Sequence, residues 1–173
     1  TIIMKKRVFI LAGEHSGDFF GALLARDLKK LDPELDIFGI GSERMKKEGV
    51  NLLYDSSLWS AIGVIDAAKY VPRLLGVFAD LKGYLRRESF SLLVLIDFPT
   101  FNMRVAKFAK EIGLKTVYYF PPSAWTPKTD RAVTVSSTVD RVITTFPYTK
   151  EIYEKAGLDA VFLGHPIVGS LIP

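Results

Sequence analysis

The sequence contains no cysteine and only two histidines, His15 and His165, among its 173 residues. The lack of cysteine excludes disulfides, thiolate catalysis and cysteine-based metal sites, and it favours a cytoplasmic location because nothing calls for an oxidising compartment. Two distant histidines supply too few ligands for a zinc site, so we expect no metal. A hydrolase triad of Ser16, His15 and Asp97 is disfavoured because the G-x-S-x-G elbow is missing.

Long hydrophobic runs are missing too. No stretch reaches the roughly 18 apolar residues of a membrane-spanning helix, and the longest apolar runs, such as 92–96, have the length of a strand. The apolar run 8–12 follows the basic residues Lys5, Lys6 and Arg7, but it is too short for a signal peptide and ends at Gly13. Hydrophobic residues still make up 49% of the chain and charged residues 24%, a composition typical of a globular domain.

The net charge of +4 and the pI near 9.2 favour an anionic partner, such as a phosphate group, a membrane surface or nucleic acid. The basic residues occur in scattered pairs, for example Lys29-Lys30 and Arg86-Arg87. They are not interleaved with aromatic residues, so a nucleic-acid groove is disfavoured. For any single pair, a solvated surface is the simpler explanation.

Short apolar runs alternate with amphipathic stretches, which predicts βαβ units and a mainly parallel sheet. The run at 92–96 is continuously apolar, as in a strand covered on both faces, so the fold class is a three-layer α/β/α domain. The expected strands are 7–12, 36–40, 51–54, 92–96, 116–120, 139–144 and 160–163. The expected helices are 18–31, a short one after Ser42, 67–87, 102–112 and 149–156, with Gly113 and Gly157 ending the last two.

A glycine-bearing turn, 12–18, follows the first expected strand. Open α/β sheets bind ligands at this end of their strands. The spacing G-x-x-x-G-x-x-x-G is neither a dinucleotide fingerprint nor a P-loop. Asp18 either accepts hydrogen bonds from sugar hydroxyls or caps the helix that follows, and the sequence leaves both roles open.

Asp97 ends the most apolar strand, beside Phe98 and Phe101. Desolvation there raises the pKa of a carboxyl group toward values useful for a general base, although a strand-end aspartate also often caps the next helix. A second aromatic segment, 118–125, contains Pro121 and Pro122. It is suited either to stacking on a sugar or acyl chain or to packing beneath a loop.

The expected helix 67–87 carries an apolar arc of about 180°, wider than the roughly 100° that a core contact needs. Its excess surface either contacts lipid, with basic residues meeting anionic head groups, or is covered by another helix or domain. The arc comprises Tyr70, Val71, Leu74, Leu75, Val77, Phe78, Leu81, Tyr84 and Leu85, and the apolar residues Trp59, Ile62, Val64 and Ile65 precede it.

A set of short motifs, in order over nearly the whole chain, resembles the lipid-A-disaccharide synthase family. Each motif alone is weak, but the ordered set is specific. The motifs are Ala12-Gly13-Glu14 with Ser16-Gly17-Asp18; Gly39-Ile40-Gly41 with Arg44-Met45 and Glu48-Gly49; Ile62-Gly63-Val64; Ile96-Asp97 with Pro99 and Phe101-Asn102; Pro122-Ser123 with Trp125; Phe146-Pro147 with Glu151 and Tyr153; and Gly164-His165-Pro166.

The resemblance implies a GT-B fold, in which two Rossmann-like domains face a cleft. One domain binds the acceptor, 2,3-diacylglucosamine 1-phosphate, and the other binds the UDP-linked diacylglucosamine donor. The family forms a β-1,6-linked disaccharide with inversion at the sugar carbon, without a metal ion or cofactor, at the cytoplasmic face of the inner membrane. We therefore expect an anionic membrane surface, an acylated sugar phosphate and a UDP-sugar as partners, and no nucleic acid.

The resemblance also implies site residues. The family's essential acidic residue matches Asp97, the expected general base. The acceptor cleft is expected to be lined by Glu14, Ser16, Asp18, Asn102, Ser123 and Trp125. Membrane contact is expected from Ile62, Val64, Ile65, Val71, Leu74, Leu75 and Phe78.

The expected organisation is an acceptor-binding domain, 1–164, followed at 165–173 by the start of a linker to a donor-binding domain. The chain alone would then be inactive. Phe98, Thr100 and Thr126-Pro127 depart from the family pattern, which leaves open a non-catalytic module that binds lipid or sugar. Another GT-B enzyme, acting on a peptidoglycan lipid intermediate or epimerising UDP-N-acetylglucosamine, is a further alternative.

Overall fold

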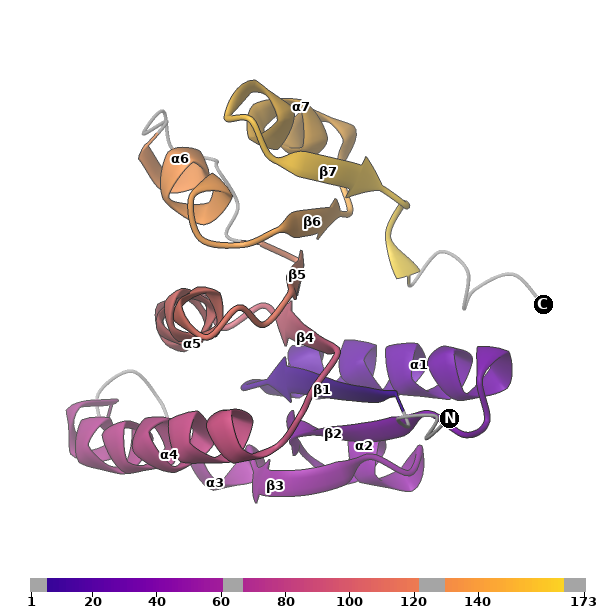
Figure 1. The fold of residues 1–173 in the computed structure, drawn as a ribbon, viewed down its shortest axis with the longest axis vertical. Coiled ribbons are helices and arrows are strands. Elements are labelled where there is room, and N and C mark those ends of the chain that lie inside the picture. Colours follow the sequence, from indigo (N-terminus) through magenta and orange to yellow (C-terminus); the bar gives the residue numbers. More distant parts are fainter. Residues whose placement is uncertain (1–5, 61–66, 122–129, 167–173) are drawn as a thin grey trace.

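The protein folds around a seven-stranded parallel sheet in the order β3-β2-β1-β4-β5-β6-β7. The structure is a computed structural model that describes residues 6–60, 67–121 and 130–166, without the side chains of 59–60, 67–70 and 130. Figure 1 shows the strands stacked from β3 at the bottom to β7 at the top. They are β1 (Arg7–Ala12), β2 (Asp36–Gly41), β3 (Asn51–Asp55), β4 (Leu92–Ile96), β5 (Thr116–Tyr119), β6 (Arg141–Thr144) and β7 (Asp159–Phe162).

Helices connect these strands in the alternating order that the sequence predicts. They are α1 (His15–Leu31), α2 (Glu43–Lys47), α3 (Ser57–Ser60), α4 (Ala67–Arg87), α5 (Pro99–Glu111), α6 (Asp130–Ser136) and α7 (Pro147–Lys155). Alternate residues of each strand feed two separate cores. Phe9 and Leu11 of β1 join a core with α4, α5, α6 and α7, whereas Val8 and Ile10 join a core with α1 and α2. The three-layer prediction is therefore confirmed.

The two faces of the sheet are covered to different extents by the described residues. An apolar groove of about 850 Å³ runs between α1 and β4–β6 on the α1 face. Phe20 and Leu24 of α1 form one side of it, and Val94, Tyr119 and Ile143 form its floor. The α1 layer is thus narrower than the sheet within the described part of the chain.

Three helices begin earlier than the sequence predicts, and two were missed. α1 begins at His15 rather than at Asp18, α5 begins at Pro99 rather than at Asn102, and α7 begins at Pro147 rather than at Thr149. Proline is well suited to the first position of a helix because that position needs no amide donor. The short helices α3 and α6 have too few turns to show an apolar period. Gly113 and Gly157 take positive φ values of 72° and 82°, which confirms them as the ends of α5 and α7.

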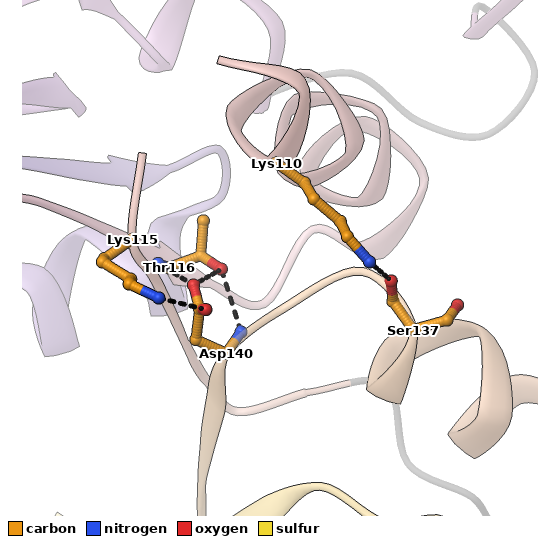
Figure 2. Close-up of polar contacts among 5 residues, drawn as sticks. All are labelled: Lys110, Lys115, Thr116, Ser137 and Asp140. Atoms are coloured by element: carbon orange, nitrogen blue, oxygen red, sulfur yellow. Dashed lines mark hydrogen bonds and ion pairs between the residues drawn. The ribbon is translucent and has the colours of Figure 1, made fainter. Parts of the chain in front are cut away.

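Asp140 bonds to the first residue of β5 just before β6 begins (Figure 2). Because the sheet is parallel, this is the edge opposite the carboxyl ends of β1 and β4. Its Oδ2 accepts hydrogen bonds from the Thr116 amide at 2.8 Å and the Thr116 hydroxyl at 3.2 Å, and its Oδ1 lies 3.2 Å from Lys115 Nζ. Burial alone would raise the pKa of Asp140, but these donors outweigh it and lower the pKa. The carboxylate therefore helps to fix the register of the two strands.

We expect Asp140→Ala to destabilise the protein by about 1 kcal/mol at neutral pH, because a hydrogen-bonded carboxylate is lost at a partly solvated site. Because the folded pKa is lowered, this contribution is present above the ordinary aspartate pKa and is lost as the pH falls through the folded value. Urea unfolding at neutral and acidic pH measures it. Glu154→Ala, which removes an exposed ion pair with Lys150, is the control and should cost less; an equal loss in both variants would contradict the role of Asp140.

Candidate active site

The candidate site lies where the strand order reverses, at the carboxyl ends of β1 and β4. These neighbouring parallel strands are paired so that Ala12 lies opposite Ile96. The next residues along the chain bring Glu14 and Asp97 to the same edge of the sheet. Open α/β sheets bind ligands in the crevice at such a switch point, because the chain leaves adjacent strands toward opposite faces there.

Asp97 sits in a strained backbone turn. Asp97 and Phe98 both take positive φ values, 48° and 47°, in the left-handed region. This conformation costs a non-glycine residue on the order of 1–3 kcal/mol, so surrounding contacts must hold it. The Asp97 carbonyl accepts hydrogen bonds from Asn102 Nδ2 at 2.6 Å and from the Tyr118 hydroxyl at 2.8 Å. Asn102 also donates to the Ile96 carbonyl at 3.1 Å. These bonds fix the turn from inside the fold.

Phe98 covers the glycine turn that follows β1. A Cβ atom on Gly13 would lie 2.1 Å from Cδ1 of the Phe98 ring, so any larger residue there would force the ring to move. The same ring stacks on Phe101 of α5 with ring centroids 5.5 Å apart. Phe98 thus packs the turn after β4 against the turn after β1, next to the half-buried Asp97.

The two carboxyl groups at this edge are both less acidic than usual. Burial raises the pKa of Asp97, and a hydrogen bond from the Phe98 amide offsets only part of this effect. The pKa of Glu14 is raised by burial and then by the nearby charge of Asp97. Glu14 lies just before α1 and is exposed, so the burial that acts on its carboxyl group is only partial. A carboxylate with a raised pKa is a stronger base than a solvated one, as general-base catalysis requires.

The pattern of the Lipid-A-disaccharide synthetase family matches residues 8–172 of the chain. The lipid-A-disaccharide synthase of Geobacter metallireducens is 40% identical over 97% of this chain, and lipid-A-disaccharide synthase 1 of Legionella pneumophila strain Lens is 39% identical over 94%. The chain belongs to the lipid-A-disaccharide synthase family. It spans 44% and 42% of the lengths of these two relatives, which is less than half of each.

Solved structures of other families share the fold. MurG of Acinetobacter baumannii matches with a TM-score of 0.59 at 13% identity, over 92% of this chain and 45% of that one. A UDP-N-acetylglucosamine 2-epimerase matches with a TM-score of 0.58 at 13% identity, over 93% of this chain and 48% of that one. Matching about half of each neighbour is expected for one of the two Rossmann-like domains of a GT-B protein, so the predicted fold class is confirmed.

Two of the residues expected to line an acceptor cleft are instead bonded to backbone. Asp18 is only 4% exposed, and its carboxylate accepts hydrogen bonds from the amides of Ser42 at 2.6 Å and of Arg44 and Met45 at 3.2 Å. Asp18 therefore caps α2, although it lies 25 positions before that helix in the sequence. Asn102 is fully buried and holds the Asp97 turn. These contacts favour structural roles for both residues over the predicted contact with a sugar.

Glu14 and Ser16 are exposed at the start of α1, where a ligand could reach them. Ser123 and Trp125 lie outside the described residues, so their expected role stays a prediction. Tyr118 belongs to the aromatic segment 118–125 noted in the sequence, but its hydrogen bond to the Asp97 carbonyl was not predicted. A signal was present, because a buried tyrosine usually finds a hydrogen-bond partner and Tyr118 alternates with residues on the opposite face of β5.

The wide apolar arc of α4 divides into a buried and an exposed part. Val77, Leu81 and Leu85 lie in the core, whereas Val71 and Leu75 are 51% and 49% exposed. Among the expected membrane contacts, Ile62, Val64 and Ile65 lie outside the described residues. Within the described ranges, no helix is long and apolar enough to cross a bilayer. A small cavity of about 160 Å³ is lined by Val71, Leu74, Leu75, Phe78, Phe98, Thr100, Phe101 and Arg104.

We expect Asn102→Ala to lower the free energy of unfolding by about 2–4 kcal/mol, because it leaves the strained Asp97 turn without two buried hydrogen bonds. Urea denaturation monitored by circular dichroism measures the loss. Asn51→Ala, at an exposed position at the start of β3, is the matched control and should change stability by less than about 0.5 kcal/mol. Equal effects in the two variants would show that Asn102 does not support the turn.

The charge of Asp97 should have a measurable effect on the pKa of Glu14. We expect Asp97→Asn to lower the pKa of Glu14, because it removes the carboxylate charge that raises it. Carbon-13 NMR titration of the glutamate carboxyl groups measures the shift, and Asp159→Asn at the opposite edge of the sheet provides the control. An unchanged Glu14 pKa in Asp97→Asn would contradict the proximity of the two groups.

Proposed function

We propose that this chain forms the acceptor-binding half of a lipid-A-disaccharide synthase. The full-length enzyme would transfer 2,3-diacylglucosamine from its UDP derivative to 2,3-diacylglucosamine 1-phosphate, forming a β-1,6 disaccharide and releasing UDP. The observation that carries the proposal is the position of Asp97, a half-buried carboxylate with a raised pKa at the switch point of the sheet. Membership of the family supplies the reaction in which such a base is needed.

Asp97 acts as the general base in this proposal. Its carboxylate takes the proton from the 6-hydroxyl of the acceptor as that oxygen attacks the anomeric carbon of the donor. The bond between this carbon and the UDP oxygen breaks on the opposite side, so the configuration inverts and UDP leaves with the bonding electrons. Exposed Glu14 and Ser16 would accept hydrogen bonds from the sugar, and the strained turn would hold the base in position.

The proposal also places the enzyme at the cytoplasmic face of the inner membrane. Val71 and Leu75 expose apolar surface near the start of α4, and Arg73 on the same helix is exposed. A helix that presents apolar and basic side chains together can bind at the surface of an anionic bilayer. The acylated acceptor would then be drawn directly from the lipid phase.

We expect Asp97→Asn in the full-length protein to lower kcat by about a hundredfold to ten-thousandfold, the usual contribution of a general base. Asparagine keeps an acceptor for the Phe98 amide, so the KM for the acceptor should change little. Formation of disaccharide and UDP from both lipid substrates measures the effect. Asp159→Asn is the control, and kcat unchanged in Asp97→Asn would remove Asp97 from the mechanism.

The Asp97→Asn variant should not unfold more easily than the wild type. Because the folded pKa of Asp97 is raised, the folded state binds more protons between the ordinary and the raised pKa, and stability falls as pH rises through that window. Removing the charge should therefore leave the melting temperature at neutral pH equal or higher.

For the wild type, kcat/KM should fall as pH decreases through a value above the ordinary aspartate pKa of about 3.9. Binding of the acceptor by the wild type without any release of UDP would favour a non-catalytic module instead.

A further inference from the structure

The small cavity between α4 and α5 is almost entirely apolar. Leu74, Phe78 and Phe101 form its inner walls and pack against the main core, while Val71 and Leu75 form a half-exposed rim. The core therefore does not fill this space, although the side chains around it are those of a core. Surface apolar residues that surround a hollow mark a binding site more often than isolated ones do.

The cavity shares a wall with the turn that holds the proposed base. Phe98, the residue after Asp97, lines the cavity, and its ring also covers Gly13 and stacks on Phe101. A molecule in the cavity is thus separated from the Asp97 turn by a single aromatic side chain. Any occupant that extends past Phe98 reaches the edge of the sheet where Asp97 and Glu14 lie.

The volume of about 160 Å³ limits what can enter. An apolar cavity of roughly 150 Å³ takes a guest the size of benzene, which corresponds to about six carbon atoms. A helix or a folded partner is much too large, and a sugar ring would bury most of its hydroxyls against apolar walls. A narrow hydrocarbon chain fits both the size and the chemistry.

One cation lies at the same cavity. Arg104 of α5 is exposed and lines the cavity together with the exposed Thr100. Among the described residues, no carboxylate forms an ion pair with Arg104. A guanidinium group binds phosphate through paired hydrogen bonds. The surroundings therefore suit an amphiphile that has an apolar chain and an anionic head group.

We propose that this cavity binds one acyl chain of the acylated sugar phosphate acceptor, with Arg104 facing the phosphate. The identity of the acceptor rests on the proposed function, whereas the place of its chain rests on the cavity. The chain anchors the lipid so that the sugar lies over the edge of the sheet beside Asp97. Phe98 and Phe101 close the inner end of the cavity and limit how many methylenes it holds.

The test uses the full-length protein and a 2,3-diacylglucosamine 1-phosphate analogue that carries a photoreactive diazirine on one acyl chain. Mass spectrometry after irradiation should find the label on residues 71–78 and 98–104. Leu75→Trp, which fills the rim, should weaken binding of the analogue about tenfold, as expected for excluding about two methylenes. Val133→Trp, at an exposed position on α6, is the matched control and should bind normally. Labels confined to other segments, or normal binding by Leu75→Trp, would overturn the proposal.

A second pair of variants tests the phosphate contact. Arg104→Gln should weaken binding of the phosphorylated analogue several-fold and leave that of the dephosphorylated analogue unchanged, whereas Lys107→Gln, one turn away and exposed, should change neither. Equal effects of Arg104→Gln on both analogues would contradict the contact. If Leu75→Trp reduces flotation with anionic vesicles but not binding of the analogue, the cavity contacts the bilayer and the proposal fails.

The outcomes separate this inference from the proposed function. Labelling at the cavity without formation of disaccharide would support the acyl site and refute the reaction. Formation of disaccharide with labels elsewhere would support the reaction and refute the acyl site.

Discussion

The site depends on one strained turn and the buried side chains that hold it. Asp97 and Phe98 both occupy the left-handed region, which neither residue prefers. Asn102 and Tyr118 donate to the Asp97 carbonyl, and neither is accessible to solvent. These two hydrogen bonds act on the backbone carbonyl, whereas the half-buried carboxylate accepts a hydrogen bond from the Phe98 amide at the edge of the sheet. In the proposed function, the carbonyl of Asp97 would thus serve stability and its carboxylate would serve the reaction.

The elements of the fold could be predicted because their signals are local. A buried parallel strand such as β4 is continuously apolar, and a helix such as α4 shows its period over several turns. The starts of α1 and α5 were less predictable because the turns before them are fixed by contacts from elsewhere. At α5, Phe98 packs on Gly13, which lies 85 positions earlier in the sequence. No local pattern around residue 98 encodes that contact.

The site could be predicted only in part, for a related reason. A polar residue at the end of a buried strand or the start of a helix can serve a ligand or the backbone, and sequence alone does not distinguish the two uses. Asp18 serves the amides of α2, which begins 25 residues later, and Asn102 serves the turn before its own helix. Asp97 differs because its backbone carbonyl accepts the hydrogen bonds from Asn102 and Tyr118, while its half-buried carboxylate accepts the Phe98 amide. Only the contacts of the folded chain distinguish these uses.

The same turn borders the apolar cavity beside α4. Helix α4 packs its inner residues against the core, but α5 begins only after the turn has changed the direction of the chain at Phe98. The rings of Phe98 and Phe101 stack on each other, and a cavity remains between them and Leu74 and Phe78. A regular, unstrained connection from β4 to α5 would change the position of Phe98 and with it the wall of the cavity. The geometry that places Asp97 at the edge of the sheet therefore also shapes the apolar cavity beside it, and in the proposed function this one turn would couple the base to the binding of lipid.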